Sequence, residues 1–142
     1  MNIYVDAIIK EATKASKKKE VPIGAIVVRN NKIISKAHNL RIKNNDVTSH
    51  AEIIAIKKAA RKLKDWRLSD CDLYVTLEPC SMCMEVIKES RINNVYYLLT
   101  REKSKKTYYK TNVRLITEID SKSIIEDYRN LLSNFFKLNC KR

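Results

Sequence analysis

One histidine and two cysteines constrain the fold of this chain more than any other feature. His50 stands two residues before Glu52, and the segment Pro79-Cys80-Ser81-Met82-Cys83 follows much later in the sequence. Imidazole and thiolate are good zinc ligands, and two thiolates three positions apart can hold one ion from the first turn of a helix. If these side chains share an ion, the fold must place two distant segments side by side.

The same pattern predicts a catalytic site with an open ligand position. We expect both ligand groups at the starts of helices, where the helix dipole favours negative charge and lowers the pKa of a thiol. A zinc ion held by three side chains keeps a fourth position for water, as a catalytic site requires.

The remaining candidate ligands do not complete this site. Cys71 lies at the far end of a predicted strand from Cys80, roughly 20 Å or more away at ~3.3 Å per strand residue. We expect Cys71 to be a small apolar side chain in the core. Cys140 lies in the terminal tail, where we expect an exposed thiol, and His38 follows a different predicted strand.

Glu52 has two competing interpretations. The sequence Ser49-His50-Ala51-Glu52 matches a capping box, in which the carboxylate only satisfies the backbone at the start of a helix. A carboxylate two residues from a metal ligand can instead reach water on the metal and carry its protons. We favour this second role because Pro79 and both cysteines accompany it, although Pro79 also suits the turn that enters a helix.

Hydrophobic periodicity predicts an α/β fold in a single domain, residues 1–142, without repeats or a linker. β-Branched runs on either side of Asn30-Asn31 predict a hairpin, and helices alternate with strands after it. This order predicts a mixed sheet covered by helices on both faces. The expected helices span residues 3–19, 49–63, 81–90 and 121–138, and the expected strands span 23–29, 32–37, 72–77, 94–99 and 113–117.

The scarcity of glycine and the hydropathy pattern disfavour several classes of protein. Gly24 is the only glycine, whereas a Walker loop or a Rossmann turn needs several. The longest aliphatic run, residues 23–28, is far shorter than the ~20 residues that cross a bilayer. Asp6, Lys10 and Glu11 interrupt the stretch that a signal peptide would need. We therefore expect a cytoplasmic protein without a membrane span.

The chain carries a formal net charge of +13, from 29 Lys and Arg against 16 Asp and Glu. Such an excess favours a polyanionic partner such as nucleic acid. A general bias of the composition toward Lys, Ile and Asn would also produce it. The charge therefore supports a nucleic-acid partner but does not decide between these two explanations.

These motifs resemble those of a known group of enzymes. His-x-Glu followed by Pro-Cys-x-x-Cys is the signature of the cytidine-deaminase-like zinc superfamily. The chain also resembles the bacterial tRNA-specific adenosine deaminases (the TadA family) over about residues 1–103 and again near 131–137. The matching segments are Glu20-Val21-Pro22-Ile23-Gly24-Ala25, Ala37-His38-Asn39, Thr48-Ser49-His50-Ala51-Glu52, Leu73 to Cys83, and Ser90-Arg91-Ile92.

The resemblance implies a three-layer α/β/α sandwich with a five-stranded sheet, a homodimer with one zinc ion per subunit, and a tRNA anticodon loop as substrate. The implied reaction hydrolyses the wobble adenosine to inosine, with attack of activated water at C6 and proton transfer by Glu52. Asn39 would hydrogen-bond the flipped nucleotide, and the substrate pocket would include Gly24, Ala25 and Pro79. From the residues alone, Asn39 is a turn residue after a strand and Gly24 a kink at a strand start.

The resemblance fails after the fourth expected strand. Residues 98–112 contain no glycine, although the family usually carries glycines there, and Arg101 stands near the place of a family Asp. The segment combines Tyr108 and Tyr109 with several lysines, a composition that can stack bases and neutralise phosphates. A solvated basic loop anchored by its tyrosines explains the composition equally well. The candidate RNA contacts are Arg101, Lys103, Tyr108 and Tyr109.

Three functions are compatible with these residues. A tRNA adenosine deaminase fits the motif, the charge and the context of Asn39. A deaminase of a free base or nucleotide, such as guanine, cytosine or deoxycytidylate, would use the same motif, and the altered segment after residue 98 would suit a changed substrate. An RNA-binding module with a structural zinc needs a fourth protein ligand, which we do not find in the sequence.

Overall fold

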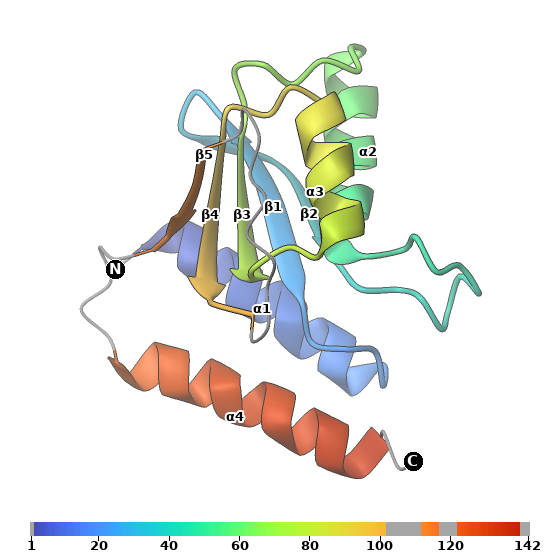
Figure 1. Cartoon of the computed structure of the whole chain (residues 1–142), viewed down its shortest axis with the longest axis vertical. Coiled ribbons are helices and arrows are strands. Elements are labelled where there is room, and N and C mark those ends of the chain that lie inside the picture. Colours follow the sequence, from blue (N-terminus) through green and yellow to red (C-terminus); the bar gives the residue numbers. More distant parts are fainter. Residues whose placement is uncertain (1, 102–111, 117–121, 140–142) are drawn as a thin grey trace.

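Five strands form one mixed sheet at the centre of the computed structural model, which describes residues 2–101, 112–116 and 122–139 (Figure 1). The strand order is β2-β1-β3-β4-β5. β1 (Gly24–Arg29) pairs antiparallel with β2 (Lys32–His38) and with β3 (Asp72–Leu77). β4 (Asn94–Leu99) runs parallel to β3, and β5 (Asn112–Leu115) runs parallel to β4.

A tight turn joins the first two strands, as the sequence predicts. Asn30 and Asn31 have φ angles of 52° and 61°. Asparagine tolerates this left-handed region better than most residues, and a two-residue hairpin turn requires it. The register shifts between Val27 and Val28, and beyond this bulge Gly24 pairs with His38. The hairpin therefore brings the end of β2 next to the start of β1.

Helices cover both faces of the sheet (Figure 1). α2 (Ala51–Leu63) and α3 (Ser81–Glu89) pack side by side on one face. α1 (Ile3–Lys17) and α4 (Lys122–Asn139) lie on the other. This three-layer arrangement around a mixed sheet confirms the α/β/α fold that we expected. Among the described helices, none is long and apolar enough to cross a membrane.

Apolar side chains fill the space on both sides of the sheet. One cluster, which includes Leu73, Val75 and Ile87, lies between the sheet and the α2/α3 layer. A second cluster, which includes Leu98 and Tyr128, lies between the sheet and the α1/α4 layer. Cys71 is completely buried in the first cluster, which confirms its expected place in the core. Cys140 lies outside the described residues.

The observed elements differ from the expected ones only at their ends. α1 ends at Lys17 rather than residue 19, because Lys19 has a positive φ of 60° that a right-handed helix cannot contain. α2 begins at Ala51 rather than residue 49, after an extended His50. β5 begins at Asn112, one residue before the predicted strand, and ends at Leu115.

Candidate metal centre

Two helix starts bring the three candidate ligands together. His50 is the N-cap residue of α2 and Cys80 is the N-cap residue of α3, both with extended backbone. Neither side chain hydrogen-bonds its own helix start, so both are available to other partners. Cys83 lies in the first turn of α3 and is completely buried. α2 and α3 lie side by side (Figure 1). The imidazole and the two thiols therefore meet, with their ligand atoms within 4.8 Å of one another.

The distances fit a single tetrahedral ion. Nδ1 of His50 lies 3.8 Å from Sγ of Cys80 and 3.4 Å from Sγ of Cys83. A nitrogen and a sulfur on one tetrahedral zinc ion would be roughly 3.6 Å apart, given Zn–S of ~2.3 Å and Zn–N of ~2.0–2.1 Å. Within the described ranges, no other His, Cys, Asp or Glu joins this group. Among the described residues the donor set thus has three members, which is the number of protein ligands in many catalytic zinc sites.

The two thiols form a hydrogen-bonded pair that favours one thiolate. The hydrogen bond with Cys83, aided by the imidazole of His50 and opposed by burial, lowers the pKa of Cys80 to about 3. The same hydrogen bond, together with burial, raises the pKa of Cys83. The pair thus holds a thiolate at neutral pH, which is the form that binds a metal.

Glu52 lies against these ligands with one oxygen unpartnered. Its side chain is buried, and its Oε1 forms no hydrogen bond within the part of the chain that the structure describes. Burial is the main cause that raises the pKa of this carboxyl group, and Cys80 raises it further. An unpartnered buried oxygen is costly. Its position beside three metal-ligand atoms indicates that its partner is something other than the described protein.

The capping-box interpretation of Glu52 is wrong for this helix. In a capping box the carboxylate would accept the backbone N–H of Ser49. That N–H instead donates to the carbonyl oxygen of Asp46 at 3.1 Å, and His50 rather than Ser49 is the N-cap residue. The first turn of α2 is capped from outside, because Oδ1 of Asn39 accepts the N–H of Ala51 at 2.8 Å.

Asn39 therefore has a structural role at the end of β2. It is 2% exposed, and its backbone N–H donates to the carbonyl oxygen of Ile23 at 3.2 Å. These bonds agree with its interpretation as a turn residue. Its side-chain amide nitrogen forms no hydrogen bond to another described residue. The expected contact with a nucleotide stays a prediction.

Gly24 is explained by close packing against α1. A Cβ atom at this position would lie 2.1 Å from the carbonyl oxygen of Ile8 and 2.7 Å from the backbone nitrogen of Ala12. Any other residue would therefore push the helix away from the sheet. Ala25 and Pro79 are buried as well, and the expected place of all three in a substrate pocket stays a prediction.

Glu78, which lies in the matching segment Leu73 to Cys83 but received no role from the sequence, connects the residue before Pro79 and Cys80 to the segment after β4. It is completely buried, and its N–H donates to the carbonyl oxygen of Leu99 at 2.9 Å. Its Oε1 accepts the N–H of Arg101 at 3.1 Å, and Nε of Arg101 donates to its carbonyl oxygen at 3.1 Å. Arg101 thus has a structural role, and its contact with RNA stays a prediction. The other expected RNA contacts lie outside the described residues: Lys103, Tyr108 and Tyr109.

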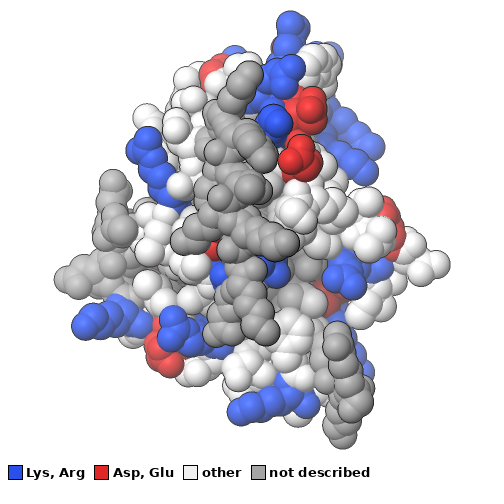
Figure 2. Space-filling model, in the orientation of Figure 1, with Lys and Arg blue, Asp and Glu red and all other residues white. Residues whose placement is uncertain are grey.

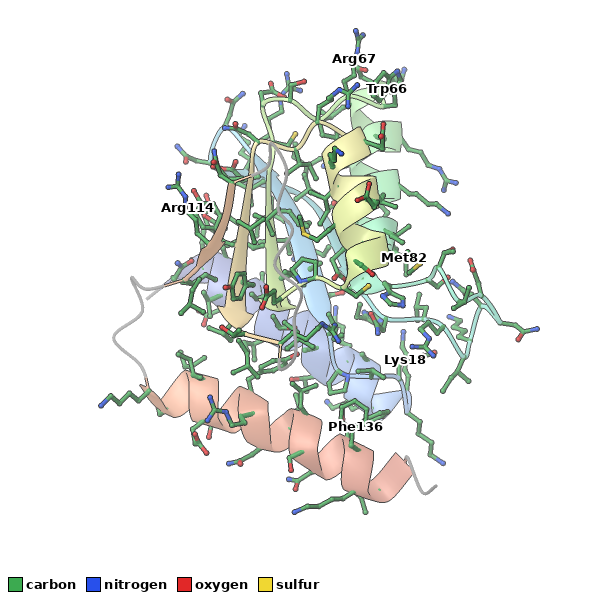
Figure 3. All side chains as sticks on the ribbon, viewed as in Figure 1. Lys18, Trp66, Arg67, Met82, Arg114 and Phe136 are labelled. Carbon is green, nitrogen blue, oxygen red and sulfur yellow. The ribbon has the colours of Figure 1, made fainter. Side chains whose placement is uncertain are left out.

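The opposite end of the α2/α3 layer carries a different group of side chains. Figure 3 shows Met82, which stands between the two cysteines, at one end of this layer and Trp66 with Arg67 at the other. The exposed ring of Trp66 lies 5.7 Å from the guanidinium of Arg67 and 5.8 Å from that of Arg91. The candidate ligands and Glu52 therefore lie at one end of the α2/α3 layer, where both helices begin.

Comparisons with known proteins agree with this geometry. The family model of the MafB19-like deaminases matches residues 1–139. The tRNA-specific adenosine deaminase of Aquifex aeolicus (strain VF5) is 38% identical over 144 residues, which cover 94% of this chain and 92% of that protein. A solved structure from studies of A-to-I editing by tRNA:A34 deaminases is 36% identical, with a TM-score of 0.75, and covers 80% of this chain and 96% of that chain.

A second solved structure shares the fold but has a different named activity. The X-ray structure of guanine deaminase from Bacillus subtilis is 34% identical, with a TM-score of 0.66, and covers 70% of this chain and 66% of that chain. The similarity to the Aquifex enzyme extends over more of both proteins. With its histidine, two cysteines and buried glutamate at two helix starts, the chain belongs to the tRNA-specific adenosine deaminase family.

Proposed function

We propose that this chain is a zinc-dependent deaminase that hydrolyses adenosine to inosine at the wobble position of tRNA. The proposal takes residues 1–142 as one deaminase domain, acting in the cytoplasm as a homodimer with one zinc ion per subunit. The observation that carries it is the buried Oε1 of Glu52, which has no hydrogen-bond partner among the described residues and lies beside three potential metal-ligand atoms. Hydrolysis of an aromatic amine needs an activated water and a proton carrier in one site. A zinc ion held by His50, Cys80 and Cys83 would supply the first, and Glu52 would be the second.

His50, Cys80 and Cys83 would hold the zinc ion. When bound, zinc supplies a Lewis acid that makes water an effective nucleophile near neutral pH. The two cysteines bind as thiolates, which the start of α3 favours through its dipole. The burial of Cys83 keeps competing solvent away from this side of the site.

Glu52 moves the protons. Water adds to C6 of the adenine ring and the amino group leaves as ammonia, so one molecule of water is consumed for each inosine formed. Oε1 of Glu52 accepts a proton from the attacking water and transfers it to N1 of the ring, and the carboxyl group then assists the departure of ammonia. Burial suits this role because it raises the pKa of the carboxyl group, which favours holding a proton between the two transfers.

Two features of the chain favour binding of RNA: its positive charge and the side-chain nitrogen of Asn39, which bonds no other described residue. The net charge of +13 favours contacts with phosphates. Figure 2 shows Lys and Arg side chains distributed widely over one face of the molecule, with fewer Asp and Glu among them. The side-chain nitrogen of Asn39 would donate to the flipped nucleotide beside Gly24, Ala25 and Pro79. The proposed contacts to the anticodon loop are Arg101, Lys103, Tyr108 and Tyr109.

An anticodon stem–loop with adenosine at the wobble position tests this function. The metal-loaded protein should convert that adenosine to inosine and leave the other adenosines of the loop unchanged, as read by sequencing or nucleoside analysis. Glu52→Ala should abolish conversion while the protein keeps its zinc. Bound zinc without turnover on this RNA would contradict the proposal. Sedimentation equilibrium of the same preparation tests the homodimer.

Deamination of a free base is the second candidate, and the similarity to guanine deaminase favours it. Release of ammonia from guanine, cytosine or deoxycytidylate, measured beside the stem–loop, separates the two candidates. We expect no release from these small molecules, because the charge of the chain matches a polyanion. Ammonia from one of them, without inosine in the RNA, would replace the first candidate by the second.

A further inference from the structure

We propose that Trp66, Arg67 and Arg91 form a second RNA-binding site, which takes an unpaired nucleotide of tRNA from outside the anticodon arm. The inference rests on the proposed function and deepens it, because it names another contact with the same substrate. Trp66 and Arg67 lie at the end of the α2/α3 layer opposite Met82 and the candidate metal ligands (Figure 3).

Trp66 presents a large aromatic ring to solvent. Its side chain is 59% exposed, although Leu68, two positions later, is completely buried. The guanidinium of Arg67 lies 5.7 Å from the centre of the indole ring, and that of Arg91 lies 5.8 Å from it. Both distances are in the range of a cation–π contact. An exposed aromatic ring beside guanidinium planes is the kind of surface on which unstacked bases of RNA stack.

Hydrogen bonds fix the backbone under this surface. Oδ1 of Asp65 accepts the N–H of Arg67 at 3.0 Å and its Nε at 3.1 Å. The N–H of Leu68 donates to the carbonyl oxygen of Ser90 at 2.7 Å. This bond joins the loop after α2 to the end of α3 and brings Arg91 to Trp66. A surface that is ordered before binding loses less conformational entropy when a ligand binds.

Positive charge surrounds the tryptophan. Residues 57–67 carry six Lys or Arg and one Asp. Figure 2 shows several Lys and Arg side chains at this end of the molecule. Within the part of the chain that the structure describes, three exposed residues here form no ion pair: Arg61, Lys62 and Lys64. Cations at the end of a helix also stabilise its dipole, but this does not explain an exposed tryptophan among them. The charge and the ring together match a nucleotide with its phosphates.

A hollow beside Arg67 offers room for a base. It has a volume of about 360 Å³ and is lined by Arg29, Leu63, Asp65, Arg67, Ser69 and Asp70. Nε of Arg29 lies 2.8 Å from Oδ2 of Asp70, and Nε of Arg67 lies 3.1 Å from Oδ1 of Asp65. Because these charges are paired, the hollow presents donors and acceptors to the edge of a base, while the phosphates are left to the unpaired cations of α2.

The distance from the metal centre determines which part of tRNA this site takes. α2 has 13 residues, so its two ends lie roughly 20 Å apart at ~1.5 Å per residue. The loop nucleotides that enter the metal centre cannot contact Trp66 as well. The bases of the anticodon stem are paired and are not available for stacking. The nucleotide at Trp66 therefore comes from another part of the tRNA.

Fluorescence of the wild-type ring tests this binding directly, because Trp66 is the only tryptophan of the chain. The zinc-loaded Glu52→Ala variant is titrated with a full-length tRNA transcript that carries adenosine at the wobble position, and separately with its anticodon stem–loop. A base stacked on the indole should lower the emission by about half or more with the tRNA, and the stem–loop should lower it by less than about one tenth. Equal quenching by both RNAs, or none by the tRNA at saturation, would overturn the proposal.

Substitutions measure what the site contributes to affinity. Trp66→Ala should weaken binding of the full-length tRNA about five- to fiftyfold, and Trp66→Phe, which keeps an aromatic ring, less than about threefold. Both variants should convert the stem–loop at the wild-type rate, which also shows that they fold. Arg91→Gln should weaken binding of the tRNA and reduce its salt dependence by about one phosphate contact. Arg114→Gln removes the same charge from an exposed position on β5 and should change the affinity less than about twofold.

Three results would contradict the site. Unchanged affinity of Trp66→Ala for the tRNA would exclude stacking on the ring, and an equal loss in Arg114→Gln would indicate a general effect of charge. Sedimentation equilibrium of Trp66→Ala should match the wild type. A changed oligomeric state would assign Trp66 to a contact between two copies of this chain. If the wild-type protein converts no RNA, the proposed function fails, whereas quenching by the tRNA still decides whether RNA binds at Trp66.

Discussion

Glu20 and Glu52 are equally buried, at 2% exposure each, but their carboxylates have opposite surroundings. Both oxygens of Glu20 accept backbone N–H groups, from Ile42 at 3.1 Å and Lys43 at 2.9 Å, and so fix the loop between β2 and α2. Oε1 of Glu52 has no partner among the described residues, although Cys80 lies near it.

The difference distinguishes a carboxylate that stabilises the fold from one that is placed for chemistry. When a satisfied buried carboxylate is removed, the backbone donors that it paired lose their partner. An unsatisfied buried carboxylate lowers stability instead, and such groups are concentrated at functional sites. The same isosteric substitution should therefore have opposite consequences at Glu20 and Glu52.

The largest effect on activity should come from replacing one of the candidate metal ligands beside Glu52. Cys83→Ala removes one of three donors, so we expect zinc content to fall from about one to below roughly one tenth per chain, with no measurable deamination. Metal analysis and the stem–loop assay check this result. Cys71→Ala changes a cysteine that is outside the ligand group and should keep both zinc and activity. Full zinc binding by Cys83→Ala would show that Cys83 is not a ligand, and the contrast between Glu52 and Glu20 would then lose its explanation.

Glu52→Gln should cost activity without costing stability. The amide keeps the shape of the side chain but cannot accept and return a proton, so we expect kcat to fall about 10²- to 10⁴-fold. The zinc-loaded variant should unfold in denaturant at a midpoint equal to or above that of the wild type, because a buried charge is removed. A marked loss of stability with activity retained would make Glu52 a structural residue like Glu20.

Glu20→Gln should give the opposite result. One oxygen that accepts an N–H group is replaced by an amide nitrogen that cannot, so we expect the free energy of unfolding to fall by about 1–3 kcal/mol. In the folded protein kcat should remain within about threefold of wild type. Denaturant unfolding and the stem–loop assay, run on both glutamine variants, complete the comparison. If Glu20→Gln lowered kcat as much as Glu52→Gln, the distinction between a structural and a catalytic carboxylate would be wrong.

Glu11 is a third buried carboxylate, and its replacement should have a smaller effect on stability than that of Glu20. Its carboxylate lies 3.0 Å from Nδ1 of His38 and 2.9 Å from Nζ of Lys14. Burial alone would raise the pKa of Glu11, but the hydrogen bonds and charges of His38 and Lys14 together lower it. A lowered pKa gives stability that is present above the ordinary pKa of ~4.3 and is lost as the pH falls through the pKa of the folded protein. Below about pH 4.5, the unfolding free energy of Glu11→Gln should therefore fall less steeply with decreasing pH than that of the wild type. An equal slope in both proteins would contradict a lowered pKa of Glu11.

The sequence predicts the helices and strands well because their signals are local. The alternation of β-branched runs around Asn30-Asn31 and the helical spacing of apolar residues depend on neighbours in the chain, so every described element has its expected type. Element ends are less predictable, because they depend on distant partners. The start of α2 illustrates this, since Asn39 caps Ala51 and Ser49 is engaged by Asp46.

The ligand group is also predictable, because the chemistry of a metal restricts it to few residue types and to short spacings within each segment. Residues that act through long-range hydrogen bonds have no such pattern. Tyr128 and Pro22 are separated by 106 positions, and Glu78 and Arg101 by 23. Glu20 lies in a segment that matches the family, but nothing in the sequence indicates that it fixes the backbone of Ile42 and Lys43. The partners of these residues are identified by burial and geometry alone.

X-ray absorption at the zinc edge of the purified wild-type protein tests the central claim most directly. We predict two sulfur donors, one imidazole nitrogen and one oxygen from water, as three protein ligands and an exchangeable fourth position require. Glu52→Gln should give the same spectrum, because this substitution changes the proton carrier and leaves the three ligands in place. Four donors from the protein, or fewer than two sulfurs, would contradict a catalytic centre formed by His50, Cys80 and Cys83.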